Sequence, residues 1–151
     1  MIYQKKHPAE NIYFIKSGSA LKTWKEYDGV PIALFQPGDV FGDFEVYKNT
    51  TRLFSVMSIT EVELLVLDKT DFKNIFFRLD PSLGNNFVQE MEIRFVYLER
   101  VMQMVVDCVF QGKNLFEINQ SIINFEKMGS LLKVEDKKNF LLDSFQSKLF
   151  F

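Results

Sequence analysis

The chain is poor in the residues on which most catalytic sites depend. Its 151 residues include one cysteine, Cys108, and one histidine, His7. A single cysteine excludes an intramolecular disulfide, and Ser/His/Asp or Cys/His catalysis would depend entirely on His7, which stands beside Pro8 in an expected exposed turn. The His and Glu ligands of a β-barrel metalloenzyme are also missing. The sequence therefore predicts a protein that is neither an enzyme nor a metal binder.

A strong charge of either sign and a long hydrophobic run are lacking too. The formal net charge is -2, which gives no positive field to attract nucleic acid or an anionic membrane. Charged residues, among them Glu99 and Asp107, interrupt the most apolar stretch, Phe95 to Phe110, so it falls short of a membrane span. No charged leader followed by an apolar run opens the chain. We expect an intracellular, cytoplasmic protein.

Apolar residues, in contrast, are abundant. The chain is 47% hydrophobic and contains 17 phenylalanines, which predicts a packed globular core dominated by phenylalanine. From Ile12 to about Leu67, short β-branched and aromatic runs alternate with Gly, Pro and Asp turns, a pattern typical of a small β-barrel or jelly roll. The expected strands cover residues 12–15, 20–24, 31–35, 53–59 and 62–67.

Helical spacing replaces the strand pattern after Asp68. It predicts a short helix over 69–79, a long amphipathic helix from about Ser82 to Phe110, and a further amphipathic stretch from Phe116 to Met128. A break is expected at Gly129-Ser130, and the chain ends in Lys-Leu-Phe-Phe.

The long helix carries two apolar stripes, which together make a wide face. The first follows steps of three and four, and comprises Val88, Met91, Phe95, Leu98, Met102, Val105 and Val109. The second comprises Tyr97, Val101, Met104 and Cys108. Packing on the β-domain and a seam with a partner helix are both open interpretations. We expect protein partners to bind through the helix Val88 to Val109 and the Phe-rich C-terminus.

One segment, GDVFGDFEVYKNTTR at residues 38–52, combines a glycine turn with a lone arginine. Backbone N–H groups at such a turn, together with the guanidinium of Arg52, suit a phosphate. Asp39, Asp43 and Glu45 could instead bind a cation, but their spacing is not that of an EF-hand loop. An anion site is the better interpretation, although the acidic residues oppose it.

Residues 2–80 as a whole resemble the cyclic nucleotide-binding domain of kinase regulatory subunits, gated channels and catabolite activators. IYQKKHPAENIYFIKSGSA resembles that family's opening strand, turn and strand, and QPGDVFGD its Pro-Gly-Asp-x-Phe-Gly-Glu signature. TTRLFSV resembles the end of the phosphate cassette, and LLVLDKTDFKNIF the last strand and following helix. The resemblance implies a mainly β then α fold: a β-roll (jelly roll) over residues 1–80, without the family's first helix and strand, and a helical extension over 81–151.

The resemblance also implies a ligand site. Its cassette residues would be Gly42, Asp43, Phe44, Arg52 and Ser55. In that scheme Arg52 and backbone amides hold the cyclic phosphate, Asp43 takes the ribose 2'-hydroxyl, and a helix beginning near Phe87 closes over the base. Leu53 stands where members selective for cyclic GMP often carry threonine, so cyclic AMP is the implied ligand.

Departures from the family pattern leave two functions open. Asp43 replaces the usual Glu, Glu45 replaces a small residue, and Phe54 replaces an alanine. These favour a ligand-free structural or interaction module in a larger intracellular assembly, such as one in a cilium or on the cytoskeleton. The retained cassette residues favour a cyclic AMP sensor whose ligand repositions the C-terminal helix. If the Glu45 carboxylate lies within salt-bridge reach of Arg52, we expect an empty pocket.

Overall fold

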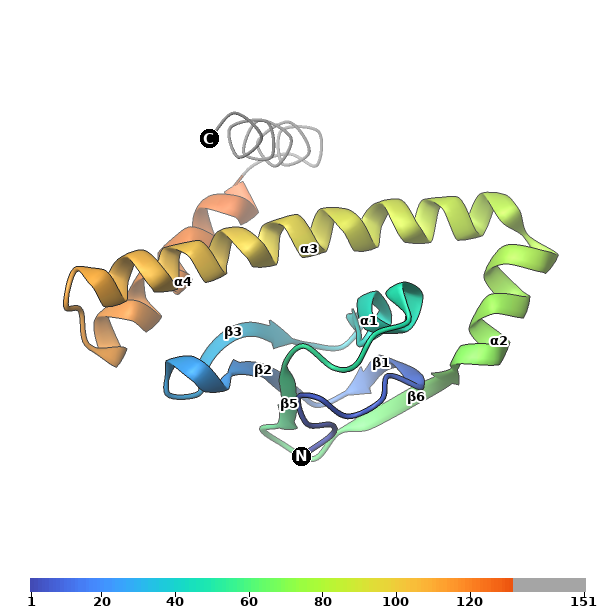
Figure 1. Cartoon of the computed structure of the whole chain (residues 1–151), viewed down its shortest axis with the longest axis horizontal. Helices are drawn as coiled ribbons and strands as arrows, with labels where there is room; N and C mark the ends of the chain where they lie inside the picture. The colour runs from blue at the N-terminus through green and yellow to red at the C-terminus, as the bar shows by residue number, and fades with distance from the viewer. Residues whose placement is uncertain (132–151) are drawn as a thin grey trace. The chain divides into compact units, whose positions relative to one another are not determined.

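The computed structural model describes residues 1–131, which form β-strands followed by helices (Figure 1). The chain divides into two compact units, Met1–Met91 and a second that begins at Glu92. All the described strands and the start of the long helix belong to the first unit. The division into residues 1–80 and 81–151 stays a prediction.

The strands form two antiparallel three-stranded sheets, with the orders β4-β1-β6 and β3-β2-β5. Their bounds are β1 Asn11–Ser17, β2 Ala20–Trp24, β3 Val30–Phe35, β4 Val40–Phe41, β5 Ser55–Ser58 and β6 Glu63–Asp68. The predicted mainly β then α fold is confirmed. The sequence did not predict β4, which is too short to show a period, and the strand expected from residue 53 begins only at Ser55.

Strand β1 is covered on both faces by apolar clusters. The inner cluster is built around Tyr3, Ile15, Ala20, Phe41 and Val56. The helix-side cluster is built around Ala9, Ile12, Val46 and Phe72, with Phe76 and Phe87 packed against it. Because successive side chains of a strand point to opposite faces, Ile12 and Ile15 belong to different clusters. This is why NIYFIKS is apolar at nearly every position rather than at alternate ones.

Phenylalanine is prominent in the two apolar clusters, as predicted, but it is not the commonest fully buried residue. Among the described residues, five valines and five isoleucines are buried, compared with the three phenylalanines Phe41, Phe54 and Phe72. Five of these valines and isoleucines lie on strands, where branched aliphatic side chains pack well, and the other five lie on helices.

The helices agree closely with the spacing of apolar residues. Their bounds are α1 Asp43–Lys48, α2 Lys69–Lys73, a following π-helix η2 Asn74–Leu79, α3 Pro81–Phe110 and α4 Leu115–Leu131, with a short 3-10 turn η1 at Lys25–Tyr27. The break predicted at Gly129-Ser130 is wrong, because α4 continues to Leu131. A glycine inside a helix costs about 1 kcal/mol relative to alanine, which need not end the helix. The final Lys-Leu-Phe-Phe lies outside the described residues.

Both predicted stripes of α3 contribute buried side chains. They are Met91, Leu98 and Val105 from the first stripe, and Val101 and Cys108 from the second. Val109, at the end of the first stripe, is exposed. A partner helix on α3 therefore stays a prediction. No helix within residues 1–131 has the length and apolar character that crossing a membrane requires.

Candidate functional site

The segment from β4 to β5 forms a turn, a short helix and a loop that ends at Arg52. Gly42 lies between β4 and α1 with a left-handed φ of 77°. Asn49 ends α1, also in the left-handed region, and its N–H donates to the carbonyl of Val46 at 3.2 Å. These two turns bring the chain back, so that Arg52 approaches the start of α1.

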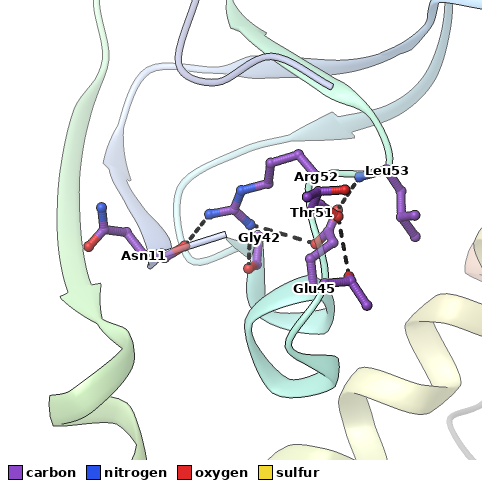
Figure 2. A network of polar contacts seen from close by, with 7 residues as sticks. Asn11, Gly42, Glu45, Thr51, Arg52 and Leu53 are labelled. Carbon is purple, nitrogen blue, oxygen red and sulfur yellow. Dashed lines mark hydrogen bonds and ion pairs between the residues drawn. The ribbon is translucent and has the colours of Figure 1, made fainter. Parts of the chain in front are cut away.

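The guanidinium of Arg52 is buried, with only 2% of the residue exposed. Its Nη1 donates to the carbonyl of Gly42 at 2.6 Å, and its Nη2 donates to the carbonyl of Asn11 on β1 (Figure 2). Nη1 also lies 3.7 Å from Oε2 of Glu45. The arginine therefore joins β1 to the cap and first turn of α1.

Glu45 points into the cassette. The residue is 2% exposed, and its Oε1 accepts a hydrogen bond from the backbone N–H of Leu53 at 3.3 Å (Figure 2). One carboxylate thus contacts both the buried guanidinium and the next backbone amide. These are the two kinds of donor that would hold a phosphate oxygen. The alternative in which Glu45 faces solvent is excluded by this geometry.

Two tyrosines of the β-roll flank the arginine. The Tyr3 ring centroid lies 4.1 Å from Cζ of Arg52, and the Tyr13 centroid lies 5.8 Å from it. Burial raises the pKa of the Tyr3 hydroxyl far above its usual value, and the negative charge of Glu45 raises it further. Tyr3 is therefore neutral at physiological pH. The positive charge of Arg52 is balanced by Glu45 and by aromatic faces.

The other predicted cassette residues have varied environments. Asp43 is buried at the first position of α1, and Phe44 beside it is half-buried. The Ser55 hydroxyl accepts a hydrogen bond from the backbone N–H of Lys5 at 3.0 Å, so it stabilises the N-terminal segment. Whether any of these residues contacts a ligand stays a prediction.

The carboxylates of this segment do not converge on a cation site. Asp39 accepts from the backbone N–H of Gln36 at 2.7 Å within its own turn, whereas Glu45 faces Arg52. Across residues 1–131, no group of three or more His, Cys, Asp or Glu side chains is placed to hold a metal ion.

Phe54 is buried inside the roll. Its ring packs edge-on to Trp24 with centroids 6.5 Å apart, and Nζ of Lys22 lies 5.5 Å from its centroid. Both neighbours belong to β2. The phenyl ring therefore packs against β2, which is the strand next to β5, and it occupies space that an alanine side chain would leave empty.

Sequence analysis missed two contributors to the site. Asn11 acts through its backbone carbonyl, which no residue pattern reveals, and Tyr3 lies far from Arg52 in sequence. A hollow of about 340 Å³ beside Arg52 is lined by residues of the N-terminal segment: Ile2, Tyr3, His7, Pro8, Glu10, Asn11 and Tyr13. His7 is exposed, as predicted.

Gly42→Ala should destabilise the protein because the added methyl group strains the turn and displaces Arg52. The new Cβ would lie 2.8 Å from Nη1 of Arg52, and an L residue with φ of 77° is strained. We expect the free energy of unfolding to fall by about 1–3 kcal/mol, measured by urea denaturation. Gly38→Ala is the control, since Gly38 also has a positive φ but no atom within 4 Å of its Cβ position. Equal losses in both variants would refute the contact with Arg52.

Known proteins resemble the chain over the region that contains its β-strands. The profile of the family described as "Cyclic nucleotide-binding domain" matches residues 1–78. The chain is 30% identical over 76 residues to a cAMP-dependent protein kinase regulatory subunit of Pyricularia oryzae, and 31% identical over 113 residues to the cGMP-dependent protein kinase egl-4 of Caenorhabditis briggsae. These matches cover 50% and 73% of this chain, but only 19% and 15% of the two relatives.

A solved structure supports the fold. The cAMP-bound form of the EAL enzyme Bd1971 matches with a TM-score of 0.52 at 20% identity, covering 73% of this chain and 30% of that one. At this identity the likeness concerns the fold alone. The family profile extends over the whole β-roll, including Gly42, Glu45 and Arg52. The chain belongs to the cyclic nucleotide-binding domain family.

Proposed function

We propose that this chain is a non-catalytic cyclic nucleotide-binding-like module whose phosphate cassette is filled by its own glutamate, and that it acts as an interaction module in a larger intracellular assembly. The observation that carries the proposal is the placement of Glu45. Its carboxylate lies 3.7 Å from the Arg52 guanidinium and accepts the N–H of Leu53.

An internal carboxylate has two effects on a nucleotide phosphate. It accepts the N–H of Leu53 and lies within ion-pair distance of Nη1 of Arg52, and it repels the phosphate charge. Two unit charges 4 Å apart interact by about 4 kcal/mol at an effective dielectric constant of 20, so the repulsion can cost several orders of magnitude in affinity. The internal contact loses no translational freedom when it forms, whereas a free nucleotide does. Glu45 therefore competes effectively with a nucleotide phosphate for the Arg52 guanidinium and the N–H of Leu53.

A second candidate function is a cyclic AMP sensor. Two observations favour it: Arg52 is held beside Gly42 by hydrogen bonding, and Asp43 is buried at the start of α1. In this scheme the phosphate displaces Glu45, and α3 responds through Phe87, whose ring packs 5.4 Å from Phe72 and 4.7 Å from Phe76. A ligand can shift α3 only by binding one of its positions more tightly than the other.

Calorimetric titration of the purified chain with cyclic AMP and cyclic GMP separates the two functions. We expect no saturable heat with either nucleotide up to about 1 mM, a limit that corresponds to about -4 kcal/mol of binding free energy. A cooperative thermal transition in the same sample serves as the control for a folded protein. Saturable binding in the micromolar range would refute the ligand-free module and establish the sensor.

A further inference from the structure

The short helix α1 and the helical segment formed by α2 and η2 line an open groove of about 550 Å³, the α1–α2 groove. Its eight lining residues all belong to the first compact unit, Met1–Met91. Three of them are aromatic, three are basic and none is acidic. None of the residues that contact the Arg52 guanidinium lines it. The α1–α2 groove is therefore distinct from the phosphate cassette.

Aromatic rings form the apolar part of the groove. Phe72 of α2 is buried, and its ring packs edge-on against Phe77 of η2 with centroids 5.5 Å apart. The ring of Tyr47 on α1 is stacked with Phe77, with centroids 6.1 Å apart and an angle of 22° between the planes. Tyr47 and Phe77 are each 37% exposed. Aromatic rings held by their neighbours offer apolar contact area at a small entropy cost, so the groove suits an apolar side chain.

Basic side chains surround these rings. Lys69 and Lys73 are four residues apart on α2, a spacing that places them on the same side of the helix. Arg78 of η2 also lines the groove, and Nζ of Lys48 lies 5.4 Å from the centroid of the Tyr47 ring. The formal net charge of the chain is -2, so this concentration of positive charge is a local feature.

No carboxylate within residues 1–131 forms an ion pair with these four basic side chains. Lys69 donates to the side-chain carbonyl of Asn49, which carries no charge. Asp71 lies two residues from each lysine of α2, and a step of about 100° per residue places it on the opposite side of the helix. The carboxylate of Asp68 accepts the N–H of Asp71 at the start of α2. The positive charge of the groove is therefore available to a partner.

An acidic protein segment fits this combination better than other anionic partners do. With four basic residues at the groove and a net charge of -2 overall, the rest of the chain is net negative. It would repel the extended negative surface of a nucleic acid or an anionic membrane. A phosphate group alone would leave the aromatic rings uncovered. A short segment with one apolar side chain between Asp or Glu residues covers the rings and brings carboxylates to the basic side chains.

We infer that the α1–α2 groove is a docking site for an acidic segment of a partner protein, which inserts one aromatic or leucine side chain against Tyr47 and Phe77. Carboxylates beside this anchor pair with Lys73 and Arg78. The anchor supplies most of the affinity, whereas the exposed charge pairs mainly supply selectivity. This inference rests on the proposed function as an interaction module, for which it names a surface and the class of partner.

The probe is a fluorescein-labelled peptide, Gly-Glu-Asp-Trp-Leu-Asp-Glu-amide, titrated into the full chain and followed by fluorescence anisotropy. One matched control peptide has Lys in place of every acidic residue, and the other has Ala in place of Trp and Leu. We expect the probe to bind at least about tenfold more tightly than either control. Its affinity should fall as the salt concentration rises from about 0.05 M to about 0.5 M, because charge pairs exposed to solvent are screened.

Two pairs of variants locate the binding surface. Arg78→Glu should weaken binding of the probe by at least about tenfold, whereas Lys25→Glu, the same change of charge at an exposed residue of η1, should alter it by less than about twofold. Tyr47→Ala should also weaken binding by about tenfold, because it removes apolar area from the groove. Its control is Met57→Ala on β5, where the side chain is 42% exposed. Thermal unfolding checks that each variant is folded, and Arg78 is exposed, so its replacement should leave the fold intact.

Absence of binding at millimolar probe, or binding that is insensitive to Arg78→Glu or to Tyr47→Ala, would refute docking in the α1–α2 groove. Equal affinity for the probe and its Ala control would indicate attraction by charge alone and would also overturn the inference. Vesicles of phosphatidylserine and phosphatidylcholine and a single-stranded oligouridylate are tested with the same variants. If either binds in a manner that depends on Arg78 while the probe does not bind, the groove belongs to that class of partner and the inference is wrong.

Nucleotide titration at Arg52 is a separate measurement. Micromolar nucleotide binding would refute the proposed function, while the peptide result still decides whether the α1–α2 groove binds an acidic segment.

Discussion

Arg52→Ala should lower the free energy of unfolding by about 3–5 kcal/mol in the absence of any nucleotide, which is the cost of removing one partner from a buried ion pair. The variant leaves Glu45, 2% exposed, without its cation. It also removes a donor from the carbonyl of Gly42, which is buried, and from that of Asn11, which is half-buried. An arginine whose only role was to bind a ligand would cost far less. Urea denaturation monitored by circular dichroism measures the change.

A double-mutant cycle tests the physical reason. Arg52→Ala combined with Glu45→Ala should cost less than the sum of the two single variants, because the double variant leaves no uncompensated buried charge. Arg78→Ala on η2 is the control, since an exposed arginine should change stability by at most about 0.5 kcal/mol. A loss below about 1 kcal/mol in Arg52→Ala would contradict the structural role of the buried pair.

Residue spacing and family resemblance together predicted most of the fold. The β-branched and aromatic runs identified the strands of the roll, and the steps of three and four identified α3 over nearly its full length. These features carry information because a strand or helix repeats its pattern several times. The two-residue β4 repeats nothing, so no period could reveal it. The sequence did not predict that α4 continues past Gly129, because the length of a helix depends on all of its residues and not on one glycine.

The candidate site was less accessible to sequence reasoning. The resemblance assigned Gly42 and Arg52 to one phosphate cassette, and in the structure they form a hydrogen bond. Residue order could not tell whether Glu45 faces the arginine or solvent, because both orientations are compatible with a short helix. Nor could it show Asn11 or Tyr3 at the guanidinium, since one acts through its backbone and the other through tertiary packing.

Lys6 has a backbone conformation that is uncommon for a residue with a side chain. Its φ of 74° is left-handed, a conformation that usually selects glycine. Its N–H donates to the carbonyl of Arg52 at 2.8 Å, and the N–H of Arg52 donates to the carbonyl of His7 at 2.8 Å. These paired bonds help to hold the turn despite the strain. They also fix the backbone of Arg52 independently of its side chain.

The same reasoning predicts that Glu45→Ala creates a nucleotide site. Removal of the carboxylate exposes the N–H of Leu53 and one side of the Arg52 guanidinium to a ligand. We expect cyclic AMP affinity to rise by at least about 10- to 100-fold, which corresponds to about 1.4–2.8 kcal/mol. Bound nucleotide would then supply the negative charge that the buried arginine loses, so the variant should gain thermal stability as nucleotide is added.

Glu45→Gln separates charge from volume. The amide keeps the size of the side chain and can still accept from the N–H of Leu53, but it no longer repels a phosphate. If repulsion is the main barrier, Glu45→Gln should recover much of the affinity gained by Glu45→Ala; if occupied volume is the barrier, only alanine should. The measurement is calorimetry at matched nucleotide concentrations, with Glu63→Ala on the exposed end of β6 as the control. Silence in both Glu45 variants would contradict the role assigned to this carboxylate and identify Phe54, buried beside Trp24, as the side chain to replace next.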